Sequence, residues 1–532
     1  MKRTPPHLTR REVIAGSAAL TMGLPSRSFS QDRPTLQSRP RLGVNLAGPA
    51  DWNTELPFVD VFRMARPWVS QRAGAEWGEG PDLDLDEHGW VRQLAKGCWA
   101  ETLVCTIGGG HYPSGVYTVL YEGVGEFEFK DSAKLRSKSP GRLTIDVDAS
   151  RGEGFRIQLL KTDPANYVRN IRVLMPGSED LNRPDMFASP FLERWQGIAC
   201  LRFMDWMETN DSRIVSWSER PTRQLATYQN VGIPLETMVD LANELRTDPW
   251  FCMPHLANDD YIRSFAEFVA EHLAPGLKAW VEFSNEVWNG QFDQHDEAGE
   301  LGMEMGFGEQ PWEAAWHYTA HRSVQIFRIW ESVFGGSERL VRVLPSQASS
   351  TFVSERVLTF EDAYRHADVL AVAPYIGCVV APSGDEGPTE PVVERWTVDR
   401  VLDYMERRAL VTTLTELGRQ TEMAQRYGLK LVAYEGGQHM TPILGSENNE
   451  KITKLFHAAN AHPRMRDIYA AMYRGWADAG GDLFCHYSSI ARWNKWGSWG
   501  MKQHSDEDPL GAPKYRASIE WAKQCGQAMS LT

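Results

Sequence analysis

The chain has 532 residues, of which 42% are hydrophobic and 24% are charged. This balance excludes a wholly disordered chain, because there is enough apolar surface to offset the entropy lost on folding. Lys and Arg number 56 against 70 Asp and Glu, and the net charge of −14 argues against a nucleic-acid partner. The length fits two to four domains, one of which can be a barrel of about 250 residues or more.

Residues 1–30 have the pattern of an export signal. A basic stretch that ends at Arg10 and Arg11 precedes the apolar run 13–24, which is too short to span a bilayer. The arginine pair favours the twin-arginine route, and an ordinary secretory signal is the alternative. We therefore predict export to the periplasm or the medium. No later stretch reaches about 18 apolar residues, so we expect no membrane partner after export.

Beyond residue 40, short apolar runs alternate with helical patterns. Such runs, nearly continuous in apolar residues, are typical of parallel strands covered on both faces. Helical spacing lies between several of them, as at 233–246, 258–275 and 319–333. Eight strands with intervening helices predict a (β/α)8 TIM barrel, with an open doubly wound sheet as the alternative. The eight runs are 41–48, 197–206, 250–256, 278–284, 340–345, 368–375, 429–434 and 482–487.

A different pattern interrupts the barrel after its first strand. Between about 100 and 178, apolar and polar residues alternate in short runs separated by Gly, Pro, Asp and Ser. This alternation is typical of antiparallel strands. We predict a small β-sandwich-like domain over 69–190, inserted in a barrel formed by 41–68 and 191–525. A structural role and a sugar-binding role are both open for this insertion.

A barrel of this kind carries its functional site at the carboxyl ends of its strands. Two glutamates stand out there, Glu286 after the fourth strand and Glu435 after the seventh. Each follows an apolar strand, where burial makes a charge costly. Retaining glycoside hydrolysis needs two carboxylates about 5–5.5 Å apart, one protonated and the other ionised. The alternative is two glutamates that cap helices or bind backbone amides.

The motifs Ser-Asn-Glu at 284–286 and Tyr-Glu-Gly at 434–436 resemble those of clan A of the glycoside hydrolases. This clan comprises barrel enzymes that include many cellulases, mannanases and xylanases. Its pattern places an Asn-Glu pair at strand four and a nucleophilic Glu at strand seven. It also places an Arg on strand two and a Tyr or His on strand six, which Arg202 and Tyr375 match.

The resemblance implies a role for each matching residue. Glu286 is the acid/base and Glu435 is the nucleophile. Asn285 contacts the sugar 2-hydroxyl, a contact that strengthens in the transition state. Arg202 and Tyr375 hydrogen-bond Glu435, and the charge of Arg202 keeps that carboxylate ionised.

Further residues at this face are candidates for sugar binding. Many clan members end strand eight with a Trp that forms the floor of the subsite for the cleaved sugar. Here the strand ends His-Tyr-Ser-Ser at 486–489, and tryptophans follow only in the next loop, so the floor residue is open. The candidates are His255, Trp288, His486, Trp493 and Trp496, with Trp499 as a further stacking platform.

The sequence as a whole predicts an exported retaining glycoside hydrolase. It would cleave β-glycosidic bonds inside a polysaccharide, with a cellulose-like β-glucan first among the substrates. We expect no cofactor and no metal, since the seven cysteines show no metal-like spacing. The alternatives are a non-catalytic carbohydrate-binding protein on the same barrel and a transglycosylase that uses the same residues.

Overall fold

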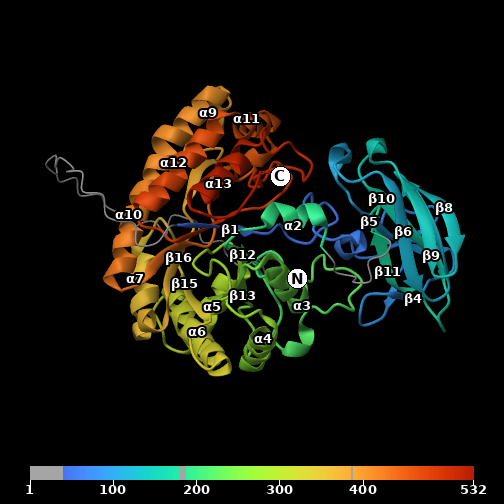
Figure 1. Ribbon diagram of the computed structural model, residues 1–532, viewed down its shortest axis with the longest axis horizontal. Helices are drawn as coiled ribbons and strands as arrows, with labels where there is room; N and C mark the ends of the chain where they lie inside the picture. The colour runs from blue at the N-terminus through green and yellow to red at the C-terminus, as the bar shows by residue number, and fades with distance from the viewer. Residues whose placement is uncertain (1–39, 179–186, 385–386, 532) are drawn as a thin grey trace, which may run out of the picture. The chain divides into compact units, whose positions relative to one another are not determined.

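The computed structural model describes residues 40–178, 187–384 and 387–531 (Figure 1). The predicted signal peptide, 1–30, lies outside the described residues. Among the residues that are described, no helix combines the length and the apolar character needed to cross a membrane.

A closed barrel of eight parallel strands forms the centre of the fold. Strand β1 pairs with β12 on one side and with β20 on the other, which closes the ring and excludes the open sheet. Each strand overlaps one of the eight predicted runs, in the same order, so the predicted barrel is confirmed. The strands are β1 (Arg41–Asn45), β12 (Cys200–Arg202), β13 (Asp248–Met253), β14 (Ala279–Phe283), β15 (Leu340–Pro345), β16 (Val369–Val372), β18 (Lys430–Ala433) and β20 (Leu483–His486).

Helices follow the strands and cover the outside of the barrel (Figure 1). Helix α4 begins where the sequence predicts, because the Asn258 side chain accepts a hydrogen bond from the Tyr261 backbone N–H at 2.8 Å. The longer helices are α2 (Ser189–Trp195), α3 (Leu235–Leu245), α4 (Asp259–His272), α5 (Asp293–Glu304), α6 (Pro311–Phe334), α7 (Thr351–Thr359), α9 (Val398–Tyr404), α10 (Leu410–Arg426), α11 (Glu450–Ala461), α12 (Arg464–Asp478) and α13 (Pro513–Gln524).

Alternate residues of each strand fill the inside of the barrel. On β13, Trp250 and Cys252 point inward, whereas Phe251 and Met253 belong to the core beneath the helices. The inward rings of Trp250 and Trp280 stack with their centroids 4.9 Å apart. The barrel interior is therefore packed with side chains and leaves the strand ends as the place for chemistry.

Eight of the strands between β1 and β12 form two antiparallel four-stranded sheets, as predicted for the insertion, and β3 (Asp84–Leu85) and β4 (Val91–Gln93) form a small two-stranded sheet. Tyr117 of one sheet contacts Phe155 of the other, edge to face at 6.0 Å, so the sheets share a core. The predicted limits of the inserted domain, 69 and 190, stay predictions. One sheet has the order β2 (Val69–Arg72), β5 (Cys98–Val104), β10 (Phe155–Thr162), β7 (Gly125–Asp131), and the other β11 (Arg169–Leu174), β6 (Gly115–Glu122), β9 (Arg142–Val147), β8 (Ala133–Ser139).

A second, smaller sheet extends two of the barrel strands. Strand β17 (Tyr375–Val380) follows β16, and β19 (Gly437–Pro442) follows β18; the two pair in parallel with Tyr375 opposite Gly437. The sequence predicts a single strand over 368–375. In the structure β16 ends before Ala373 and Pro374, and β17 then begins a separate pairing with β19. This pairing holds Tyr375 beside the segment that carries Glu435.

The inward packing leaves no room for a side chain at Gly43. A Cβ there would lie 2.6 Å from Cys485 Sγ and 3.1 Å from Cys200 Cβ. We expect Gly43→Ala to destabilise the fold by about 1–3 kcal/mol, because overpacking forces neighbouring atoms to shift. Thermal unfolding followed by circular dichroism measures the effect. The matched control is Gly377→Ala, another strand glycine whose Cβ would meet nothing within 4 Å; equal midpoints for the two variants would contradict the packing argument.

Candidate active site

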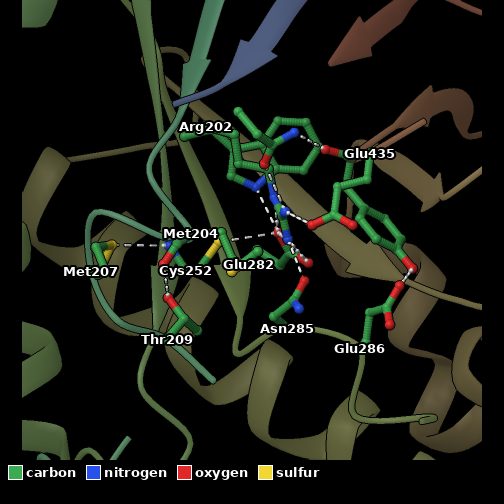
Figure 2. A network of polar contacts seen from close by, with 12 residues as sticks. Arg202, Met204, Met207, Thr209, Cys252, Glu282, Asn285, Glu286 and Glu435 are labelled. Carbon is green, nitrogen blue, oxygen red and sulfur yellow. Dashed lines mark hydrogen bonds and ion pairs between the residues drawn. The ribbon is translucent and has the colours of Figure 1, made fainter. Parts of the chain in front are cut away.

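Four barrel-strand ends bring the predicted catalytic residues together, and Figure 2 shows three of these residues, Arg202, Glu286 and Glu435. Arg202 is the last residue of β12, and Glu286 follows β14 after a short turn. Glu435 lies two residues beyond the end of β18, and Tyr375 begins β17. Three of these side chains are linked directly by hydrogen bonds, and the fourth, Glu286, is linked to them through Tyr434.

Glu435 is a buried carboxylate with a donor on each oxygen. Its Oε1 accepts from Arg202 Nη1 at 2.8 Å, and its Oε2 accepts from Tyr375 Oη at 2.8 Å. Burial raises the pKa of Glu435, while the charge of Arg202 and the hydrogen bond from Tyr375 act to lower that pKa. Both contacts orient this carboxylate and favour its ionised form against the effect of burial.

Glu286 has neutral donors instead. Its Oε1 accepts from Tyr434 Oη at 3.1 Å, and its Oε2 accepts from Asn289 Nδ2 at 2.9 Å. Burial, together with the negative charge of Glu435, raises the pKa of Glu286 to about 7. The two carboxyl groups therefore differ in the way that an acid and a nucleophile must differ.

The turn before Glu286 is strained and is held by Asn285. Ser284 and Glu286 have φ angles of 54° and 44°, the left-handed region that non-glycine residues avoid. Such positions cost about 1–3 kcal/mol each and persist where the surroundings fix them. Asn285 supplies that fixation: its Oδ1 accepts from Arg202 Nη2 at 2.8 Å and its Nδ2 donates to Asn210 Oδ1 at 3.0 Å.

Two predicted sugar-binding residues take different positions around this pair. Trp288 donates from Nε1 to Tyr434 Oη at 3.2 Å, so it belongs to the hydrogen-bond network of Glu286. His255 is buried and contacts the Glu297 carboxylate through Nε2. Burial lowers the pKa of His255, against the raising effect of Glu297.

Most of the predicted sugar-binding residues at the end of β20 and in the loop after it are buried. His486 is fully buried, with its ring 5.6 Å from that of Tyr469, and burial lowers its pKa to about 3. Trp493 is buried too and donates from Nε1 to the Gly500 carbonyl at 3.0 Å. Trp496 is 57% exposed and lies under the Lys495 ammonium.

Trp499 is the loop tryptophan that reaches the site. Its Nε1 donates to His439 Nδ1 at 3.3 Å, and its ring lies 5.9 Å from that of His439 and 6.1 Å from that of Tyr487. His439 in turn lies 5.1 Å from the ring of Tyr375, the partner of Glu435. The rings of Tyr375, His439, Trp499 and Tyr487 thus form a continuous row that starts beside Glu435, which we call the aromatic row.

The sequence analysis did not identify several residues of this site. Glu282 and Asn45 both contact Arg202, and Asn289 contacts Glu286. Asp205 hydrogen-bonds Tyr487, and burial, Glu435 and Glu208 raise its pKa to about 7. Glu282 carries a visible signal, a single charge inside an apolar strand. The described residues hold no group of three or more His, Cys, Asp or Glu side chains arranged for a metal ion.

Comparison with known proteins finds similarity in structure alone. No protein-family model matches the chain, and no curated protein matches it in sequence. Similar solved structures include a 4-O-α-L-rhamnosyl-β-D-glucuronidase from Fusarium oxysporum 12S, with 11% identity, 63% of this chain and 64% of that chain covered, and a TM-score of 0.38. The chain thus spans less than two thirds of that enzyme.

In two further matches the alignment covers a larger share of the matched structure. A mutant of Xylanase10C from Cellvibrio japonicus in complex with xylopentaose has 11% identity, coverage of 89% and 100%, and a TM-score of 0.35. An endo-β-1,4-mannanase from Thermotoga petrophila has 12% identity, coverage of 64% and 74%, and a TM-score of 0.34. Enzymes described as members of glycoside hydrolase families 5 and 26 are also among the matches. The barrel that the clan A resemblance implies is the one observed.

The electrostatic link between the two carboxyl groups can be measured without a substrate. We expect Glu435→Gln to lower the pKa of Glu286 by about one unit or more, because the substitution removes the neighbouring negative charge. An NMR titration of the 13C-labelled Glu286 carboxyl measures this pKa. Glu297→Gln, a neutralised carboxylate beside His255, is the matched control and should leave the pKa in place. An unchanged value in Glu435→Gln would show that the two groups do not interact.

Proposed function

We propose that this protein is a retaining glycoside hydrolase that cleaves β-glycosidic bonds within a polysaccharide. The observation that carries the proposal is the contrast between its two carboxyl groups. Glu435 receives hydrogen bonds from a buried guanidinium and a tyrosine hydroxyl, whereas Glu286 has only neutral donors and a pKa raised to about 7. Double displacement requires one ionised and one protonated carboxyl group.

In the first step Glu286 gives its proton to the glycosidic oxygen as the bond from that oxygen to the anomeric carbon breaks. Glu435 forms a bond to the anomeric carbon from the opposite face, which gives a covalent glycosyl-enzyme. In the second step the Glu286 carboxylate takes a proton from water, the water oxygen bonds to the anomeric carbon, and Glu435 leaves. The two inversions restore the original configuration.

The surrounding residues support these steps in distinct ways. Arg202 and Tyr375 orient Glu435 by one hydrogen bond to each oxygen, which leaves a lone pair on each oxygen for attack. Asn285 uses one Nδ2 hydrogen on Asn210 and has a second hydrogen for the sugar 2-hydroxyl. Trp288 holds the Tyr434 hydroxyl that donates to Glu286.

A neutral polysaccharide fits the charge of the site best, and a cellulose-like β-glucan is our first candidate. The site gathers acidic groups: Glu435 and Glu208 raise the pKa of Asp205, and Glu435 raises that of Glu286. The positive charge of Arg202 is already paired with the carboxylates of Glu282 and Glu435. A uronate would meet repulsion there. The aromatic row offers flat faces for the C–H groups of sugar rings, with Trp499 in place of the buried Trp493. Cleavage inside chains, and export guided by Arg10 and Arg11, belong to the same proposal.

The first test is release of reducing sugar from a panel of β-glucans, mannans, xylans and galactans. We expect release from one polymer class, and a fall of about 1000-fold or more in Glu435→Gln, because no other group replaces the nucleophile. Glu55→Gln, at a buried carboxylate that accepts hydrogen bonds from Trp195 and Ser489, is the matched control and should retain activity. Binding of a polysaccharide without any release would instead support the carbohydrate-binding alternative, and transfer to sugar acceptors in place of release would support a transglycosylase.

The second test separates the acid from the nucleophile. We expect Glu286→Ala to lower kcat on polysaccharide by about 100- to 10,000-fold, the usual contribution of general acid catalysis. On a dinitrophenyl glycoside the first step should be nearly unaffected, because that leaving group departs without protonation. Pre-steady-state release of dinitrophenol measures this step. Equal losses on both substrates would exclude Glu286 as the acid.

A further inference from the structure

Arg202 is a buried arginine whose every N–H group has an acceptor. Nη1 donates to Glu435 Oε1 at 2.8 Å and to Asn45 Oδ1 at 3.0 Å. Nε donates to Glu282 Oε2 at 3.0 Å, and Nη2 donates to the same oxygen at 2.9 Å and to Asn285 Oδ1 at 2.8 Å. A guanidinium has five N–H donors in a rigid fork, and here this set is used completely. Figure 2 shows these contacts around the Arg202 guanidinium.

Glu282 faces Arg202 from inside the barrel. It lies on β14, four residues before Glu286, and its side chain is fully buried. Besides Arg202, its Oε2 accepts from Trp250 Nε1 at 2.8 Å and lies 3.4 Å from Cys252 Sγ. An apolar strand holds a carboxylate in such a place only where paired charge and hydrogen bonds offset its desolvation.

We propose that Glu282 is a positioning residue of the reaction: it holds Arg202 by Nε and Nη2 and offsets its charge, so that only Nη1 serves the nucleophile. This inference rests on the proposed function of Glu286 and Glu435. Without Glu282 the guanidinium would be free to turn its fork toward Glu435 and bind both carboxylate oxygens. The guanidinium would then compete with Tyr375 for Oε2 and change the orientation of the carboxylate.

The charge of Glu282 also bears on the acid. Arg202 forms a charged group with two carboxylates, Glu282 and Glu435. The charge of Glu435 raises the pKa of Glu286 and the charge of Arg202 acts to lower it, while Glu282 offsets that positive charge. With a neutral residue at 282 the same group would carry no net charge, and Glu286 would ionise more readily. The other titratable groups that face this cluster are Cys252 on β13, Asp205 after β12, Tyr375 on β17, Tyr434 before Glu435, and Tyr487 after β20.

The test is the pH profile of kcat/KM for Glu282→Gln, measured on an aryl glycoside of the sugar found in the polysaccharide panel. Glu286 must be protonated to act, so activity is full below its pKa and falls as pH rises through about 7. Glu282→Gln removes a negative charge, which lowers the pKa of Glu286, and the alkaline limb should move down by about one unit. A residue with a purely structural role would reduce activity and leave this limb in place.

Glu55→Gln is the matched control. Glu55 is also a buried carboxylate, but it accepts hydrogen bonds from Trp195 and Ser489, away from Arg202. The alkaline limb of kcat/KM for Glu55→Gln should coincide with that of the wild-type protein. An alkaline limb that stays fixed in an active Glu282→Gln variant would overturn the role of Glu282 and leave the proposed hydrolase intact. Absence of turnover in the wild-type protein would contradict the hydrolase and this inference with it.

A second variant decides the matter should Glu282→Gln fail to fold. Trp250→Phe removes the Nε1 donor to Glu282 but keeps a ring face against Trp280 and Arg202. The lost hydrogen bond raises the pKa of Glu282 and so reduces its negative charge, and the alkaline limb should move down by about a few tenths of a unit. A fixed limb in this variant would equally overturn the proposal.

Discussion

The burial of one guanidinium constrains both the fold and the site. A charge taken out of water is tolerated only where paired groups surround it. The partners of Arg202 come from β1, from β14 and the turn after it, and from the segment after β18. No pair of neighbouring strands could supply them all. The contacts that make Arg202 stable are therefore complete only when the barrel has closed, and closure at the same time brings Glu286 and Glu435 into one place.

Two adjacent residues, Tyr434 and Glu435, give the two carboxyl groups different surroundings. Tyr434 turns its hydroxyl to Glu286 while its ring packs under Arg202, 5.0 Å from the guanidinium carbon. The next residue, Glu435, points to Arg202 Nη1 and Tyr375. One short motif thus supplies both a neutral donor to the acid and the nucleophile itself, which has a charged and a neutral donor.

The apolar runs were sufficient to predict eight strands in the right order, because burial on both faces leaves that signal in the sequence. Placement at strand ends likewise identified Arg202, Tyr375, Glu286 and Glu435, which the structure brings together. Glu282 could not be found in this way, since the inward face of β14 is known only once the register of the barrel is set. Trp493, Trp496 and Trp499 are three residues apart in a loop without regular secondary structure, so their spacing does not tell which ring turns inward.

The inserted sheets meet the site through the loop that follows β20. His111, between β5 and β6, contacts Asp506 through Nδ1 at 2.9 Å, and its ring stacks on that of His504 at 3.8 Å. The same loop carries Trp499, the member of the aromatic row that touches both His439 and Tyr487. Ordering the residues of a long loop costs conformational entropy, and each such contact offsets part of that cost. The contacts thus tie the insertion to the loop that carries Trp499.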